Sequence, residues 1–81
     1  MFNSSMALNL RLSGHTGKHV GFFHSGGRRY VKGWWERQDG SEGGELEIDS
    51  HTAEISDFDG CYDLPKYVYE ELKTLGIKDV Q

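Results

Sequence analysis

A basic and aromatic stretch in the middle of the sequence carries the side chains best suited to binding chemistry. Arg28, Arg29 and Lys32 are interspersed with the rings of Tyr30 and Trp34. Cations that contact phosphates and rings that stack on bases are the combination found on surfaces that bind single-stranded nucleic acid. The isoelectric point near 5.4 argues against this function, since domains that bind nucleic acid are usually basic. A small nucleic-acid-binding module that uses Arg28, Arg29, Lys32 and Trp34 is therefore our alternative hypothesis.

The carboxylates and histidines form only weak patterns for metal binding. Asp57, Asp59 and Asp63 surround Gly60, but a calcium-binding loop needs more ligands over about twelve residues and a closing glutamate. None of the histidines has the spacing of a zinc site; they are His15, His19, His24 and His51. The sequence therefore predicts no bound metal and no cofactor.

One pair of residues, Cys61 and His51, is a conceivable system for nucleophilic catalysis. The pair would need to be adjacent in space and to have an oriented base, and the sequence indicates neither. The chain also has no Gly-x-Ser-x-Gly segment, no phosphate-binding loop and no dinucleotide-binding motif. We therefore expect no catalytic residue and predict that the protein is not an enzyme.

Hydrophobic alternation predicts strands over most of the chain. Leucines at every second position of residues 8–12 indicate a half-buried strand. The segment 25–27, Ser-Gly-Gly, is typical of a tight hairpin, because glycine adopts the positive φ that such turns require. The five predicted strands are 8–12, 19–24, 28–37, 45–49 and 53–59.

One helix is predicted at the end of the chain, over residues 65–75. Pro65 suits the first helical position, where the missing N–H costs nothing, and Gly76 suits the left-handed closing position. Val68, Leu72 and Leu75 recur at helical spacing and predict an apolar stripe. Residues 1–5 are expected to be disordered. A length of 81 residues predicts a single domain over residues 1–81.

The second and third predicted strands carry bulky side chains on both sides. Val31 and Trp35 point to one face of the third strand, while Tyr30 and Trp34 point to the other; Phe23 belongs to this second group. Together in water, these rings would form an apolar patch that soluble monomers rarely expose. The sheet therefore rolls into a small barrel or half-barrel, packs on a second copy, or binds a foreign partner. Of these three outcomes we expect the homodimer.

The charges of the chain are unevenly distributed around a net charge of −4. Residues 1–33 contain five bases and no acid, whereas residues 36–63 contain ten acids and one base. Neighbouring strands with opposite charges can pair across a sheet. We therefore expect ion pairs between strands, with a bipolar surface that steers a partner as the alternative.

Cysteine use and hydropathy bear on the compartment. Cys61 is the only cysteine, so an internal disulfide is impossible, which fits a reducing compartment. No apolar run approaches the roughly 20 residues needed to span a bilayer. The first residues lack the basic and apolar segments of a signal peptide. We therefore expect a cytoplasmic protein without a membrane segment.

Two segments, 43–48 and 57–68, resemble parts of small uncharacterised proteins carried by phages, prophages and integron gene cassettes. Those proteins often end in a strand, an aromatic-Asp-Gly turn and a helix started by Leu-Pro. The resemblance covers about residues 43–76. It implies an accessory protein of a bacterial mobile genetic element, and it implies no activity and no site residue.

Taken together, these patterns predict an α+β fold: a strongly curved, mainly antiparallel, five-stranded sheet with one C-terminal helix packed on it. We expect a non-catalytic binding module that acts through protein–protein contacts as a homodimer. The predicted contact residues are Phe23, Tyr30, Trp34, Arg28, Arg29 and Lys32. The predicted core consists of Leu8, Leu10, Leu12, Val20, Phe22, Val31, Trp35, Leu46, Ile48, Ile55, Val68, Leu72 and Leu75.

Overall fold

A four-stranded antiparallel sheet and two helices make up the fold. The computed structural model describes residues 4–40, 43–59 and 64–78. The strands lie in the order β1-β2-β3-β4, and all neighbouring strands are antiparallel. The elements in chain order are α1 (Ser4–Leu12), β1 (Val20–Phe22), β2 (Tyr30–Glu36), β3 (Gly43–Asp49), β4 (Glu54–Phe58) and α2 (Lys66–Thr74).

The predicted fold class and strand direction are confirmed, but the number of elements is not. The segment predicted as the first strand forms helix α1, so the described residues contain four strands and two helices. Leu8 and Leu12 are buried one helical turn apart, whereas Leu10 is 62% exposed. Three leucines at alternating positions fit a strand as well as they fit a helix with one outward residue. Their spacing alone therefore does not distinguish the two structures. The helix begins at Ser4, within the stretch expected to be disordered.

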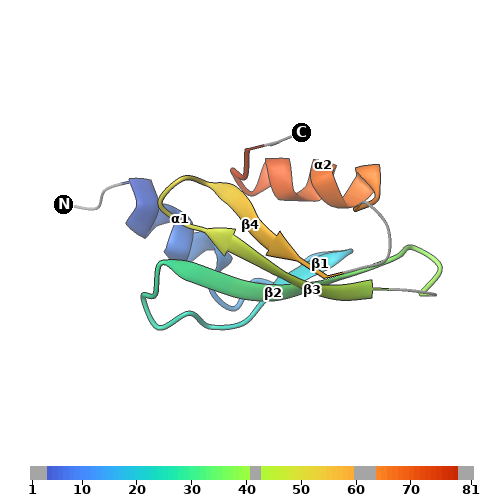
Figure 1. Cartoon of the computed structure of the whole chain (residues 1–81), viewed down its shortest axis with the longest axis horizontal. Coiled ribbons are helices and arrows are strands. Elements are labelled where there is room, and N and C mark those ends of the chain that lie inside the picture. Colours follow the sequence, from blue (N-terminus) through green and yellow to red (C-terminus); the bar gives the residue numbers. More distant parts are fainter. Residues whose placement is uncertain (1–3, 41–42, 60–63, 79–81) are drawn as a thin grey trace.

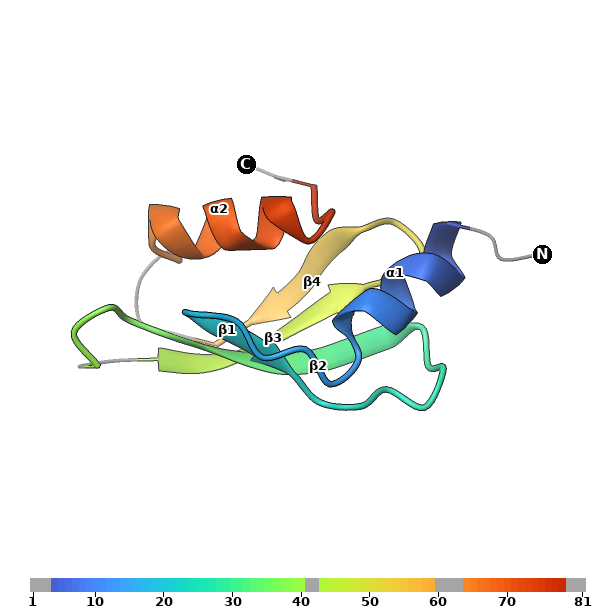
Figure 2. The ribbon, with the colours of Figure 1, turned by 180° about the vertical axis from the view of Figure 1, so that it is seen from behind.

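The two helices lie at different places on the sheet (Figure 1). Helix α2 runs across one face, while α1 lies at the end of the sheet near the β1–β2 and β3–β4 connections. The reverse view shows the same arrangement: neither of the two described helices lies on the opposite face (Figure 2). We call this opposite face the open face. Since β1 and β4 do not pair, the sheet is not closed, and a closed barrel, one of the three alternatives, is excluded.

The hydrophobic core fills the space between α2, α1 and the covered face of the sheet. Eleven of the thirteen predicted core residues are buried there. The exceptions are Leu10, which faces solvent, and Ile55, which is half-buried against the core. Leu64 and Ile77 are buried in addition. The core therefore matches most of the sequence pattern; Leu10 differs because α1 is a helix and not a strand, and Ile55 lies at the margin of the core.

Helix α2 ends as its sequence predicts. Gly76 has a φ of +100° and donates its N–H to the carbonyl of Lys73, and Ile77 donates to the carbonyl of Leu72. These two bonds satisfy carbonyls that the helix itself leaves unpaired. At the other end, Pro65 lies one residue before the helix rather than at its first position. Asp63, the predicted acid upstream of the helix, lies outside the described residues.

Candidate binding surface

Strand β2 separates its bulky side chains between the two faces of the sheet. Val31 and Trp35 are buried in the core, whereas Tyr30 and Lys32 are exposed and Trp34 is half-buried. This alternation confirms the prediction that rings of the same strand point in opposite directions. The open face therefore carries aromatic side chains that the fold of one chain does not bury.

Five of the six predicted contact residues lie together on this face. They line one shallow depression of about 440 Å³, which also includes His24, Ser25 and Glu47. The rings of Phe23 and Tyr30 are 56% and 45% exposed. We call the five residues the basic–aromatic surface: Phe23, Arg28, Arg29, Tyr30 and Lys32.

Trp34 lies further along the same face, outside this depression. Its ring lies over Gly21 of β1, where a Cβ atom would overlap the ring. Glycine is therefore needed at position 21 for the ring to lie flat on the strand. Trp34 is consequently supported by its own chain and extends the ring-bearing area beyond the basic–aromatic surface.

An ion pair with Asp49 fixes the orientation of Arg29. The guanidinium donates from Nε to Oδ1 at 2.9 Å and from Nη2 to Oδ2 at 2.8 Å, a bidentate arrangement. The same guanidinium carbon lies 5.3 Å from the centroid of the Tyr30 ring. The expected pairing of charges between segments is confirmed for this pair, and Arg29 has little capacity left for a ligand. Arg28 and Lys32 form no ion pair within the described residues.

The ion pair makes stability depend on pH in a defined window. The Arg29 hydrogen bonds lower the pKa of Asp49 from 3.8 to about 2, and the backbone N–H groups of His51 and Thr52 act in the same direction. Because the folded-state pKa lies below the unfolded value, the ionised carboxylate stabilises the fold above about pH 4. That contribution is lost as pH falls from about 4 toward 2.

We therefore expect Asp49→Asn to lower the free energy of unfolding at neutral pH, with a difference from the parent chain that shrinks below about pH 4. Urea unfolding of both proteins at a series of pH values measures this difference. A difference that stays constant down to pH 2 would show that the charge of Asp49 is not responsible.

Buried hydrogen bonds hold the turn that presents the two arginines. Asn9 of α1 donates from Nδ2 to the carbonyl of Arg28 and accepts from Ser25 Oγ at 2.6 Å. From the other side, the N–H and Oγ of Ser50 both donate to the carbonyl of Arg29. Gly26 and Gly27 have φ values of +63° and +81°, as predicted for this turn. The basic end of the surface is therefore rigidly positioned by α1 and by the β3–β4 turn.

Sequence reasoning did not identify Asn9 as a supporting residue. Asn9 is 7% exposed, and it alternates with leucines in the pattern that predicted a strand with an outward polar residue. The sequence pattern that could have identified it is the helical period, because in a helix Asn9 lies beside Leu8 and Leu12 on the inward side. Its partners, Ser25 and Arg28, are far away in sequence and carry no local signal.

Replacing Asn9 with alanine should lower the free energy of unfolding by about 2 kcal/mol, because it leaves a part-buried carbonyl and a buried hydroxyl without their partner. Chemical denaturation measures this loss. The double variant Asn9→Ala/Ser25→Ala should lose less than the sum of the two single variants, because both residues belong to one network. Strictly additive losses would show that the two side chains act independently.

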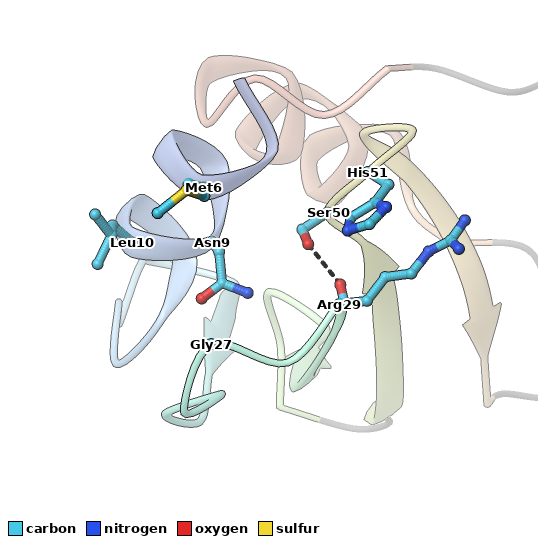
Figure 3. A pocket seen from close by; sticks show the side chains of 7 residues that line it. All are labelled: Met6, Asn9, Leu10, Gly27, Arg29, Ser50 and His51. Carbon is cyan, nitrogen blue, oxygen red and sulfur yellow. Dashed lines mark hydrogen bonds between the residues drawn. The ribbon is translucent and has the colours of Figure 1, made fainter. Parts of the chain in front are cut away.

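A second depression lies on the other side of this turn, between α1 and the β3–β4 connection (Figure 3). Its volume is about 200 Å³, and Met6 and Leu10 of α1 border it opposite His51. Three of the polar side chains around it are already bonded: Asn9 and Ser50 to backbone carbonyls, and Arg29, which extends away from α1, to Asp49. This depression therefore offers mainly apolar contact.

The other candidate chemistries gain no support from the described geometry. In the ranges 4–40, 43–59 and 64–78, no group of three or more His, Cys, Asp or Glu side chains is placed to hold a metal ion. Cys61, the candidate nucleophile, lies outside those ranges, and His51 is exposed. Neither of the helices, each nine residues long, is long and apolar enough to cross a membrane.

Comparisons with known proteins give no relative from which a function can be transferred. No family model matches the sequence, no curated protein matches it, and no solved structure matches the fold. The resemblance to proteins of mobile genetic elements therefore stays a prediction. A function has to be argued from the surface itself.

Proposed function

We propose that this protein is a non-catalytic binding module that contacts another protein molecule through the open face of its sheet. The observation that carries the proposal is the exposure of Phe23 and Tyr30 next to Arg28 and Lys32, two cations with no ion-pair partner in the described chain. Aromatic residues and arginine dominate the energetic centres of protein interfaces. Rings in this position have no role in the core of their own chain.

The rigidity of the surface also supports binding. Arg29 is held by Asp49, the backbone of the turn is held by Asn9 and Ser50, and the Trp34 ring lies on Gly21. A surface that is already ordered loses little conformational entropy when a partner docks. The arrangement therefore favours contact with a partner over a role in stabilising the chain.

The edges of the sheet are less suited to contact than its face. Strand β1 is three residues long, and His15 and Thr16 already pair with its outer side. Strand β4 is also short, its register with β3 is interrupted, and Glu54 and Asp57 add negative charge. Short strands, bulges and edge charges are features that oppose the addition of a further strand. Both the expected homodimer and a foreign partner would therefore use the open face.

Site-specific photo-crosslinking in the cells that naturally make the protein tests the proposal. A benzophenone amino acid replaces Phe23 in one variant, Tyr30 in a second and Leu10 in a control. Leu10 is a matched control because it is an exposed apolar residue on α1, away from the open face. We expect protein adducts from positions 23 and 30 and few or none from position 10.

The outcomes of this experiment are distinct. An adduct of twice the chain mass identifies a homodimer, and an adduct of another mass identifies a foreign protein; both support the proposal. Equal yields at all three positions, or no adduct from positions 23 and 30, would contradict it. An adduct that nuclease removes would replace it with the nucleic-acid alternative.

A further inference from the structure

The open face is divided into two strips with different chemistry. Strand β2 carries the rings of Tyr30 and Trp34, and Phe23 lies beside it, one residue after β1. On β3, on β4 and directly after β4, carboxylates replace the rings: Trp34 is opposite Glu45, Lys32 is opposite Glu47, and Glu47 is in turn opposite Asp57. A depression of about 110 Å³ brings the members of this acidic strip together with Lys32; they are Glu45, Glu47, Asp57 and Asp59.

The acidic strip is not neutralised within the described chain. None of its four carboxylates forms an ion pair with a described cation, and the one hydrogen bond of a Glu47 carboxylate oxygen comes from the neutral Ser56 hydroxyl. Among the described residues that line the two depressions of this face, Arg28 and Lys32 are the cations without an ion pair. The open face therefore carries an excess of negative charge directly beside exposed rings.

This charge excess argues against two of the possible partners. A second copy packed face to face sets the acidic strip either against its own copy, where like charges are strongly unfavourable, or against the ring strip, where four carboxylates would lose water and meet only two unpaired cations, Arg28 and Lys32. A single-stranded nucleic acid stacked on the rings would place its phosphates close to Glu45 and Glu47. Neither partner is complementary to both strips at once.

We infer that the partner is a basic amphipathic segment of another protein, with its apolar side on the ring strip and its lysines and arginines on the acidic strip. This inference rests on the function proposed above and names the chemistry of the partner. The centres of the two strips are two strand spacings apart, about 10 Å. This separation matches the diameter of an α-helix, so a helix that lies along the strands contacts both strips.

Titration with designed peptides tests the inference by calorimetry. The probe is a helix-forming peptide with leucines along one side and lysines beside them, and its counterpart has glutamate in place of lysine. One variant of the protein, Glu45→Lys/Asp57→Lys, reverses charge on the acidic strip. The matched control, Asp39→Lys/Glu70→Lys, changes the net charge equally at exposed positions outside the strip.

We expect the lysine peptide to bind the parent chain, the glutamate peptide not to bind, and the strip variant to bind the lysine peptide about tenfold more weakly. The matched control should change affinity by less than about threefold, since distant exposed charges are screened. Equal weakening in both variants, no binding of the lysine peptide, or tighter binding of a single-stranded oligonucleotide would overturn the inference.

A ring variant, Phe23→Ser/Tyr30→Ser, separates this inference from the proposed function. Loss of binding in the ring variant without loss in the strip variant would keep the open face as a binding surface and remove the basic partner. Unchanged binding in the ring variant would contradict both. Far-ultraviolet circular dichroism checks that each variant remains folded.

Discussion

Trp35→Ala should remove a large part of the free energy of unfolding, while Trp34→Ala should remove little of it. Trp35 is 2% exposed, lies at the centre of the core and donates its Nε1 hydrogen to the carbonyl of Asp59 at 3.0 Å. Removing such a side chain costs about 3–5 kcal/mol, and the unpaired carbonyl adds to the loss. A domain of this length has a total stability of about 4–12 kcal/mol, so the loss is a large part of it.

The neighbouring tryptophan is the matched control. Trp34 is half-buried on the open face over Gly21, and its removal opens no cavity in the core. We expect its loss to cost about 1 kcal/mol, in the range of ordinary substitutions. Urea unfolding followed by circular dichroism measures both variants. Similar losses would show that the two rings are not divided between a buried and an open face.

The effects of Leu12→Ala and Leu10→Ala on stability should differ as strongly as those of the two tryptophan variants, although the two leucines are only two residues apart. Leu12 is fully buried, so its truncation should cost about 2–5 kcal/mol. Leu10 points to solvent, and alanine favours a helix, so Leu10→Ala should change stability by less than about 0.5 kcal/mol. Chemical denaturation of the two variants gives the comparison.

This pair of variants tests the helix at the start of the chain directly. In a strand, residues 10 and 12 point to the same face, so both truncations would cost similar amounts. In α1 they point in different directions. Equal losses would therefore favour the strand that the leucine spacing first predicts and contradict the helix.

The parts of the fold that follow from local physics could be predicted from the sequence. Pro65 and Gly76 restrict the backbone whatever surrounds them, so both limits of α2 were predicted to within about a residue. The alternation of β2 likewise follows from its own residues, which divide the rings of Trp34 and Trp35 between two faces. Helix α1 was not predicted, because three leucines over five residues are compatible with either period.

The residues that lie on the candidate surface could be predicted from the sequence better than the residues that hold them in position. Bulky rings and cations in one segment indicate a contact surface without knowledge of strand order, and five of the six residues do lie together. Their supports come from distant segments: Asp49 is twenty residues from Arg29, and Asn9 is nineteen from Arg28. Such pairs carry no periodic signal, so only the folded arrangement reveals them. The acidic strip likewise depends on the register of β3 and β4 against β2.

The central claim is that a protein partner covers the open face of the sheet in the cell. Hydroxyl-radical footprinting tests it most directly, by comparing side-chain oxidation in the purified chain with oxidation inside the cells that make it. Phe23 and Tyr30 should be oxidised readily in the purified chain and protected in cells, while Leu10, which is also exposed, is oxidised equally in both. Oxidation of Phe23 and Tyr30 that is as extensive in cells as in the purified chain would contradict the claim.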